Sequence, residues 1–364
     1  MWDRDMHDQT FVRLAAREDD ADGPFDAEQR QLSVQVARLG RERRWEEALA
    51  VLASVPEAGT KLRTAALSAC ARSLQLERGQ RIFEEIQTKT VPSCNAYIML
   101  LGRLKRIRDI EKLLAFMRTQ ELQPTGVTYG CLMTAYGMVQ DTASVMRAFN
   151  DMRSAGIMPT TVTFGSALGA LARSGETAQA LELLKEMDKM RLETGPGHYT
   201  STIVSCARSK NEPKAREIFQ EMKQRGLRSN VVAYTGLMAC IPPAEGATQK
   251  ADAIFAEMKA EGVAPDGFFF NEMLNLGIIS RQPVRCREIL SEMLAAGVQP
   301  TRETEIRKQQ LERLEQEMTA VTAKADDRSL PAGWHEAKDP SSGNSYYWRA
   351  SDPGGTTTWE RPRA

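Results

Sequence analysis

Six cysteines and three histidines are among the side chains in this sequence that could bind a metal ion or act as nucleophiles and bases. Zinc sites and redox pairs need closely spaced ligands such as CxxC. No such pair occurs among Cys70, Cys94, Cys131, Cys206, Cys240 and Cys286. A zinc deaminase also needs an HxE motif, which is absent around His7, His198 and His335. We therefore expect reduced thiols on helix faces, no disulfide framework, no cofactor or metal, and no enzyme activity.

The charges of the chain are balanced, with 48 Lys and Arg against 48 Asp and Glu. The whole molecule therefore has no basic field that would attract nucleic acid non-specifically. No stretch approaches the ~20 consecutive apolar residues of a membrane span, so we expect no membrane contact. We also expect a monomer. Residues 1–28 are acidic and lack the features of a secretory signal or transit peptide. We expect this segment to be disordered.

Six methionines mark a repeat. They are separated by 35, 35, 35, 36 and 35 residues, at Met117, Met152, Met187, Met222, Met258 and Met293. A fixed period of this length is the signature of stacked structural repeats. Glycine and proline follow several of them, at Gly156 and Pro159, Gly262 and Pro265, and Gly297 and Pro300. Because glycine takes the left-handed capping conformation and proline prevents continuation, each unit is expected to end a helix there.

Each unit contains two helical patterns. The second half of one unit places apolar residues at the i, i+3, i+4, i+7 spacing of a buried helix face, at Ala251, Ile254, Phe255 and Met258. The first half, as in 127–137, is short, poor in charge and rich in small or apolar side chains. Such a helix pair cannot bury its apolar face alone, so consecutive pairs are expected to stack into an all-α superhelical solenoid.

The spacing sets about eight units between residues 29 and 301. Their expected boundaries are 29–59, 60–90, 91–125, 126–160, 161–195, 196–230, 231–266 and 267–301. The tail at 302–329 predicts a charged capping helix and a linker, with Leu311, Leu314 and Met318 on one side. A short coiled coil is the alternative for this helix.

Arginine occupies the thirteenth residue of five units, at Arg41, Arg72, Arg103, Arg173 and Arg208. Stacking of the helix pairs would place these side chains in a row, where guanidinium groups could meet successive phosphates. The alternative is the general preference of helix C-termini for cations.

The helix pair ends in "GIMPT", "GVAPD" or "GVQPT" and restarts with "VTYG", "VTFG" or "VVAYT". This pattern resembles the pentatricopeptide repeat over residues 29–301. The tetratricopeptide repeat, the nearest competitor, lacks the Gly-x-x-Pro ending. The resemblance implies an organellar protein that binds single-stranded RNA at one base per repeat. A chloroplast or mitochondrion is thus implied, whereas the acidic N-terminus also fits the cytoplasm, the nucleus or an incomplete start.

In this family the second residues of adjacent repeats sandwich a base, and the fifth and last residues of a repeat face its edge. The sandwich residues would be Val127, Val162, Val232 and Phe268. The edge pairs would be Asn95 with Thr125, Thr200 with Asn230, Thr235 with Asp266, and Asn271 with Thr301. The second pair matches the adenine type, the third matches the guanine type, and asparagine favours pyrimidines. Gly130 and Gly165 offer no side chain, so we expect a pyrimidine, two unread bases, A, G and a pyrimidine.

Residues 330–364 differ in composition, with Trp334, Trp348, Trp359, Tyr346 and Tyr347. Turn signals at "DPSSGNS" and "SDPGG" separate three short runs, typical of a small antiparallel sheet. The order "LPAGW", "YY", "TTTWERP" resembles a WW domain. The resemblance implies a three-stranded sheet with Trp334, Tyr347 and Pro362 as its core. Tyr346 and Trp359 would form a groove for a proline-rich partner in the polyproline II conformation. The alternative is that these aromatic residues serve only as core.

Two functions fit these patterns. The first is an RNA-binding adaptor in RNA processing, stability or translation, in which the solenoid holds RNA and the WW module recruits a proline-rich protein. The second is a protein scaffold whose solenoid binds a peptide or subunit and no RNA. The edge pairs and the arginine row favour the adaptor, because a peptide groove has no reason to keep them.

Overall fold

The computed structural model describes residues 26–326, 333–339, 344–349 and 358–359. These residues form helices throughout the first part and two strands near the C-terminus. The chain divides into two compact units, residues 1–242 with 249–264 and residues 243–248 with 265–364. We describe each unit by itself. The all-α solenoid expected from the sequence is confirmed.

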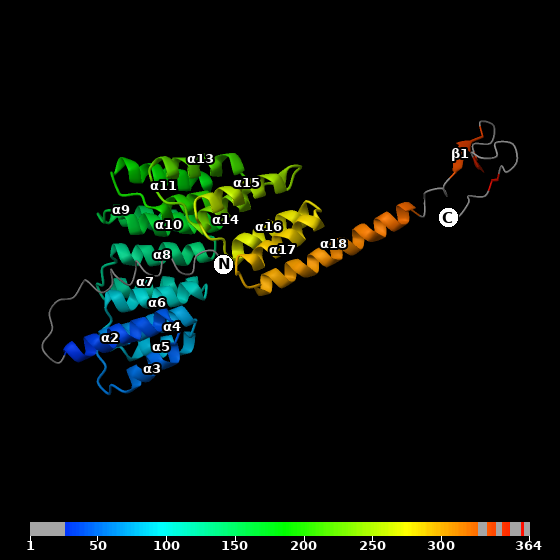
Figure 1. Cartoon of the computed structure of the whole chain (residues 1–364). Coiled ribbons are helices and arrows are strands. Elements are labelled where there is room, and N and C mark those ends of the chain that lie inside the picture. Colours follow the sequence, from blue (N-terminus) through cyan, green and yellow to red (C-terminus); the bar gives the residue numbers. More distant parts are fainter. Residues whose placement is uncertain (1–25, 327–332, 340–343, 350–357, 360–364) are drawn as a thin grey trace. The chain divides into compact units, whose positions relative to one another are not determined.

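First helices and second helices alternate along the first unit (Figure 1). The first helices are α2 (Asp26–Arg41), α4 (Thr60–Ser73), α6 (Val91–Arg103), α8 (Gly126–Met138), α10 (Thr161–Ser174), α12 (Pro196–Ser205) and α14 (Val231–Cys240). The second helices are α3 (Trp45–Ala53), α5 (Leu76–Glu85), α7 (Ile107–Thr119), α9 (Thr142–Ser154), α11 (Thr177–Lys189), α13 (Glu212–Gln224) and α15 (Ala247–Ala260). The first two residues of α15 belong to the second unit.

The first helices pack side by side, from α2 against α4 through to α12 against α14 (Figure 1). Second helices such as α3, α9 and α13 each contact the first helix before them and the one after them. The first helices from α4 to α14 begin at the first residues of the units set by the sequence spacing. Helix α2 begins at Asp26, ahead of the expected start at 29, and residues 1–25 lie outside the described residues.

The periodic methionines form the centre of each helix pair. All six have no exposed surface: Met117, Met152, Met187, Met222, Met258 and Met293. The predicted apolar face of α15 is also buried, at Ala251, Ile254 and Phe255. Each full burial of such a side chain stabilises the fold by about 1.5–3 kcal/mol. The repeat period is therefore the period of the core.

Helix ends follow the predicted punctuation. Gly156, Gly262 and Gly297 have φ angles of 75°, 69° and 72°, in the left-handed region that a side chain disfavours. Their backbone N–H groups bond to the last turn of the preceding helix, as in Gly156 N to Arg153 O at 2.9 Å. At the end of α7 the same conformation is taken by Glu121, with φ of 55°.

Small residues let neighbouring first helices approach closely. A Cβ atom built on Gly102 of α6 would lie 2.5 Å from Cβ of Ala135 in α8. A Cβ built on Gly137 of α8 would lie 2.5 Å from Cβ of Ala170 in α10. The scarcity of large side chains in the first halves of the units is therefore a packing requirement.

The second unit contains α16 (Gly267–Ile279), α17 (Pro283–Ala295) and α18 (Arg302–Asp326). Helix α18 contacts α16 and α17, and its Leu311 and Leu314 are buried. The capping role expected for the charged tail stays a prediction. Among the described residues, no helix has the length and apolar character that a bilayer crossing requires.

Two antiparallel strands follow, β1 (Trp334–Lys338) and β2 (Ser345–Arg349), with Trp334 opposite Arg349. Instead of the expected third strand, the described residues contain a single bridge between Tyr347 and Thr358, closed by two N–H···O bonds of 2.9 Å. The neighbouring residues 350–357 and 360–364, including the predicted core residue Pro362, lie outside the described residues.

Candidate nucleic-acid interface

The predicted sandwich residues lie in the first turns of their helices. Val127 of α8, Val162 of α10 and Val232 of α14 are half-buried. Phe268 of α16 is 50% exposed, although the two residues that follow it are buried. An exposed aromatic ring is the side chain of this set best able to stack on a base.

The predicted edge residues at the fifth positions are more deeply buried than a surface for base contact would suggest. Asn95, Thr200, Thr235 and Asn271 are only 7%, 2%, 2% and 5% exposed. The Thr235 hydroxyl donates to the carbonyl of Val231 at 2.8 Å. Asn95 Oδ1 and Thr200 Oγ1 are buried and have no hydrogen-bond partner within the described structure. An unpaired buried polar atom costs about 1–3 kcal/mol. Six further buried side-chain atoms of the described residues also lack a partner, and none of them belongs to a predicted edge residue.

The predicted edge residues at the last positions are helix N-caps. Asn230 Oδ1 accepts from Ala233 N at 2.8 Å, and Asp266 Oδ1 accepts from Phe269 N at 2.9 Å. Thr125 and Thr301 likewise precede α8 and α18 in capping boxes. Short polar side chains at this position satisfy N–H groups that have no partner inside the helix. Thr235 belongs to the first unit and Asp266 to the second, so each is described by itself.

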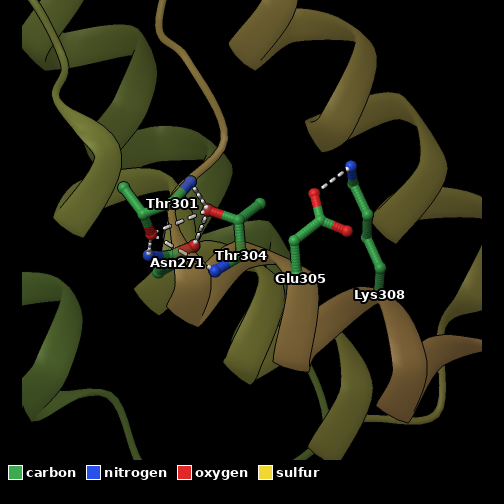
Figure 2. Close-up of polar contacts among 5 residues, drawn as sticks. All are labelled: Asn271, Thr301, Thr304, Glu305 and Lys308. Atoms are coloured by element: carbon green, nitrogen blue, oxygen red, sulfur yellow. Dashed lines mark hydrogen bonds and ion pairs between the residues drawn. The ribbon is translucent and has the colours of Figure 1, made fainter.

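Asn271 and Thr301 are brought together, and Thr304 joins them in a closed network (Figure 2). Asn271 Nδ2 donates to Thr301 Oγ1 at 3.3 Å, and the Thr304 hydroxyl donates to Asn271 Oδ1 at 2.9 Å. The backbone N–H groups of Thr301 and Thr304 donate to each other's hydroxyl oxygens at 3.0 and 3.3 Å. The hydroxyl oxygens themselves lie 3.1 Å apart.

This network leaves little spare hydrogen-bonding capacity. With one hydroxyl proton shared between them, both threonine oxygens use their proton and both lone pairs. Asn271 keeps one N–H and one lone pair of Oδ1. One turn on, Glu305 accepts from Lys308 Nζ at 2.8 Å (Figure 2). That ion pair is exposed and contributes little to stability.

Two of the five arginines of the predicted row, Arg173 and Arg208, contact the backbone of the preceding first helix. Arg173 Nε donates to the carbonyl of Gly137 at 3.3 Å, and Arg208 Nη1 donates to the carbonyl of Arg173 at 3.4 Å. These carbonyls lie at helix C-termini, where cations are favoured. Arg41 and Arg208 are exposed, whereas Arg72, Arg103 and Arg173 are half-buried. Each guanidinium has five N–H donors, so one bond to a carbonyl does not exclude a phosphate.

Sequence reasoning missed two further contacts of this kind. Gln140 Nε2 donates to the Arg173 carbonyl at 3.2 Å, and Lys210 Nζ donates to the Ala239 carbonyl at 2.7 Å. Both residues have positive φ angles just after a first helix. The sequence does contain a signal for these contacts, because a long polar residue stands at the same position of several units.

His198 is a capping residue that the sequence did not single out as one. Gly195 precedes α12 without a capping side chain, and its N–H donates to His198 Nδ1 at 3.0 Å. Nε2 of the same ring lies 3.0 Å from the carbonyl of Thr161. With Nδ1 as acceptor, Nε2 carries the proton and donates. His198 therefore links two repeats.

The six cysteines are free thiols and all are buried. Burial raises the pKa of Cys70, Cys94 and Cys286 to about 11 and that of Cys131 to about 12. At neutral pH these thiols are protonated and poor nucleophiles. Among the described residues, no group of three or more His, Cys, Asp or Glu side chains is arranged to hold a metal ion.

The two strands sort their aromatic side chains onto two faces. Directly opposed residues share a face, which groups Tyr346 and Trp348 with His335, and the bridge at Tyr347 places Trp359 on that side. The ring centroid of Tyr346 lies 5.7 Å from that of Trp348 and 5.7 Å from that of Trp359. Trp359 is 59% exposed.

The opposite face carries Trp334 and Tyr347, and Tyr347 is buried. Trp348 and His335 were not among the predicted groove residues, although the period of two along a strand was sufficient to place Trp348 beside Tyr346. The set of Tyr346, Trp348 and Trp359 is called the aromatic face below.

Comparisons with protein families give three matches. They are the pentatricopeptide repeat domain over residues 112–174, the PPR repeat over 162–192 and the pentacotripeptide-repeat region of PRORP over 187–305. A comparison with curated proteins finds no match.

Solved structures with the same fold include pentatricopeptide repeat protein PPR10 from maize, at 23% identity and a TM-score of 0.55, covering 86% of this chain. The chain spans 46% of that protein's length. PPR10 in complex with an 18-nt psaJ RNA element has 20% identity and a TM-score of 0.48, covering 86% of this chain and 53% of that one.

The pentatricopeptide domain of Arabidopsis thaliana protein-only RNase P 1, in complex with tRNA, has 13% identity and a TM-score of 0.40, covering 50% of this chain and 95% of that one. At such identities the likeness to the maize protein concerns the fold. The family matches together span 112–305. With the repeated helix pairs described above, they show that the chain is a pentatricopeptide repeat protein.

Proposed function

We propose that the helix repeats bind single-stranded RNA and that the C-terminal aromatic face recruits a proline-rich protein, so that the chain is an adaptor in RNA processing, stability or translation. The observation that carries the RNA proposal is the pair of unpaired atoms, Asn95 Oδ1 and Thr200 Oγ1. Both lie at the fifth residue of a repeat. A base edge would supply the missing partners and recover the cost of their burial.

Base stacking is the second part of the proposal. Val127, Val162 and Val232 offer half-buried apolar surface in the first turns of α8, α10 and α14. Phe268 offers an exposed ring, and stacking on an aromatic ring contributes about 1–3 kcal/mol per base. The expected order remains a pyrimidine, two bases without a partner at Gly130 and Gly165, then A, G and a pyrimidine.

The last residues contribute to base selection less directly than the family resemblance implies. Asn230 and Asp266 each use an oxygen to cap the following helix. A carboxylate or amide oxygen that accepts from one N–H keeps further lone pairs, so these residues can act as caps and acceptors together. Thr301 has no such reserve, and Asn271 alone is left to contact a base in its repeat.

The C-terminal module supports the second half of the proposal through its exposed ring. Tyr346 and Trp359 share one face at 5.7 Å, and Trp359 is largely exposed. Two adjoining rings on one face can pack against a proline, and a polyproline II ligand loses little entropy because it is already extended. The face fits the WW-like clamp proposed from the sequence, with Trp348 as a third ring.

A protein scaffold without an RNA ligand is the alternative, and one observation favours it. The fifth residues are at most 7% exposed, so a base can reach them only at the surface that remains. A peptide would need neither these atoms nor the stacking residues.

The experiment is selection of RNA from a random single-stranded pool by the full chain, repeated with Thr200→Asn and Thr235→Asn. The proposal predicts an enriched A-G step that shifts toward pyrimidines in each variant at its own position. Folded protein that enriches no sequence at moderate salt would contradict RNA binding and support the scaffold. A labelled proline-rich peptide, titrated against wild type and Trp359→Ala, tests the aromatic face separately.

A further inference from the structure

The turn between the two helices of a unit has the same backbone shape along most of the chain. The fifteenth residue of seven units follows the first helix and has a φ angle between 51° and 80°, at Arg43, Leu74, Lys105, Gln140, Gly175, Lys210 and Arg281. A side chain disfavours this conformation, yet only one of these residues is glycine. Residues held in such conformations are often found where they serve a function.

Two of these side chains have a structural role. Gln140 Nε2 donates to the carbonyl of Arg173 at 3.2 Å, and Lys210 Nζ donates to the carbonyl of Ala239 at 2.7 Å. Both bonds cross from one first helix to the next. They account for a long polar side chain at the fifteenth residue of these two units.

Arg43 and Lys105 make no such bond. Both are exposed, and neither side chain forms a hydrogen bond or an ion pair with another described residue. The acids of the adjoining turns bind other cations: Glu42 contacts Arg38 and Arg44, and Asp109 contacts Arg106 and Lys112. Contacts within the described structure therefore do not explain why a cation occupies a strained position here.

These two cations belong to a basic edge, which we define as residues 41–44, 72–75 and 103–106. It contains seven cations and one acid, whereas the equivalent residues of the next three units, 138–141, 173–176 and 208–211, contain three cations and two acids. Because α2, α4 and α6 pack side by side (Figure 1), their ends lie along one edge of the solenoid. A chain without net charge thus concentrates positive charge at this edge.

The basic edge lies next to the units predicted to contact bases. The first two units, 29–59 and 60–90, contain no predicted base-edge residue, and the series begins at Asn95 in α6. Lys105 follows Asn95 by ten residues, which is roughly 15 Å along a helix axis. A few nucleotides span this distance, so a strand with a base at Asn95 can bring its next phosphates to Lys105.

We propose that Arg43 and Lys105 bind the phosphates of an RNA flank whose bases are not read, so that the basic edge is a sequence-independent extension of the RNA site. The inference rests on the proposed RNA-binding function. Guanidinium and ammonium groups that are exposed and have no acidic partner suit a phosphate backbone. These two residues are distinct from the predicted arginine row, in which Arg173 and Arg208 already bind backbone carbonyls.

The experiment uses the full chain and the RNA that wild type selects from a random single-stranded pool. That RNA is resynthesised bare and with a flank at one end or the other, made either of uridines or of abasic nucleotides. Affinities are measured by fluorescence anisotropy over a range of salt concentrations. Arg43→Gln with Lys105→Gln is compared with a matched control, Lys189→Gln with Arg191→Gln.

The control removes the same two charges from the end of a second helix. Lys189 and Arg191 are also exposed, and Arg191 also has a positive φ angle, of 54°. Lys189 is the last residue of α11, so neither residue belongs to the basic edge.

A flank at one end should raise the affinity of wild type, and uridine and abasic flanks should act alike. Loss of two phosphate contacts lowers the slope of log affinity against log salt by about 1.4. Raising salt from about 50 to 200 mM should therefore weaken wild type roughly sevenfold more than the Arg43→Gln, Lys105→Gln variant. The control should keep the wild-type slope.

An unchanged slope in a double variant that still binds the bare RNA would overturn the inference and leave RNA binding intact. A flank that adds affinity only when it carries bases would also overturn it. If wild type selects no RNA, the proposed function fails and the inference fails with it. Binding of polyglutamate in place of RNA, lost in the double variant, would assign the edge to an acidic protein instead.

A second pair of substitutions separates RNA binding from a structural role. Glycine fits a positive φ angle, so Arg43→Gly with Lys105→Gly should raise the melting temperature and still lower the salt dependence of RNA binding. Arg191→Gly should raise the melting temperature and leave RNA binding unchanged. A lower melting temperature of the Arg43→Gly, Lys105→Gly variant, with unchanged salt dependence, would show that the two side chains support the fold and would overturn the inference.

Discussion

The repeats that begin at Val91 and Gly267 have the same asparagine at the fifth position and the same pair of threonines around the next helix start. In the first, Asn95 Oδ1 is buried without a partner. In the second, Asn271 bonds to both threonines. A code that assigns a base from residue types alone therefore omits the hydrogen-bonding state of each residue. That state decides what remains for a ligand.

Replacing the two asparagines should separate the repeats most strongly. Asn271→Leu leaves the Thr301 and Thr304 hydroxyls short of partners and should lower the free energy of unfolding by about 1–3 kcal/mol. Asn95→Leu removes a buried atom that already lacks a partner, so it should leave the free energy of unfolding unchanged or raise it. Urea unfolding of the full chain, followed by circular dichroism, measures both. Equal losses would mean that the two asparagines are bonded alike in solution.

Buried thiols in the helix after the first repeat and within the second repeat predict a loss of stability at alkaline pH. Burial raises the pKa of Cys131 in α8 to about 12 and that of Cys286 in α17 to about 11. Above an unfolded thiol pKa of about 8.5, the unfolded chain releases protons that the folded chain retains, so stability falls as pH rises. At pH 10 the loss from Cys131 is about 2 kcal/mol.

Urea unfolding at pH 7.5, 9 and 10 measures this effect. Cys131→Ala should weaken the pH dependence, and a corresponding variant at Cys286 should do the same for the second repeat. A slope that is identical in wild type and Cys131→Ala would contradict the assignment to this thiol.

We expect the smallest difference in stability from the helix ends that precede the threonine pairs of the two repeats. Glu121 and Gly297 occupy the same place and have φ angles of 55° and 72°. A side chain in this conformation costs about 1 kcal/mol, so Glu121→Gly should stabilise the chain and Gly297→Ala should destabilise it by roughly that amount. No atom lies within 4 Å of a Cβ built on Gly297, so steric clash does not confuse the result. Thermal unfolding detects both signs, and shifts in the same direction would contradict this reading.

Sequence reasoning predicted the helix pairs well because their signals are local. The period of the methionines, the glycine at each helix end and the proline beyond it depend on a few neighbouring residues. The same locality explains the first helices, whose small residues are needed for close approach, as at Gly102 and Gly137.

The candidate interface was less predictable because its contacts join residues one repeat apart. Arg173 is recognisable as a cation at a helix end, but its partner, the Gly137 carbonyl, is set by how the first helices stack. The burial of Thr200 and the bond from Thr304 to Asn271 arise in the same way. In the C-terminal module, the strand period places Trp348 beside Tyr346, a relation that the family pattern did not assign.

Our central claim is that a buried polar atom without a hydrogen-bond partner inside the repeats forms its hydrogen bond with RNA. The measurement that tests it most directly is the affinity of Thr200→Val for the selected RNA, beside its free energy of unfolding. The control is Thr202→Val in the same helix, whose buried hydroxyl already donates to the His198 carbonyl at 2.9 Å. The account predicts that Thr200→Val is at least as stable as wild type and binds RNA about fivefold or more weakly, while Thr202→Val loses stability and keeps its affinity. Unchanged RNA affinity in a stable Thr200→Val would contradict it.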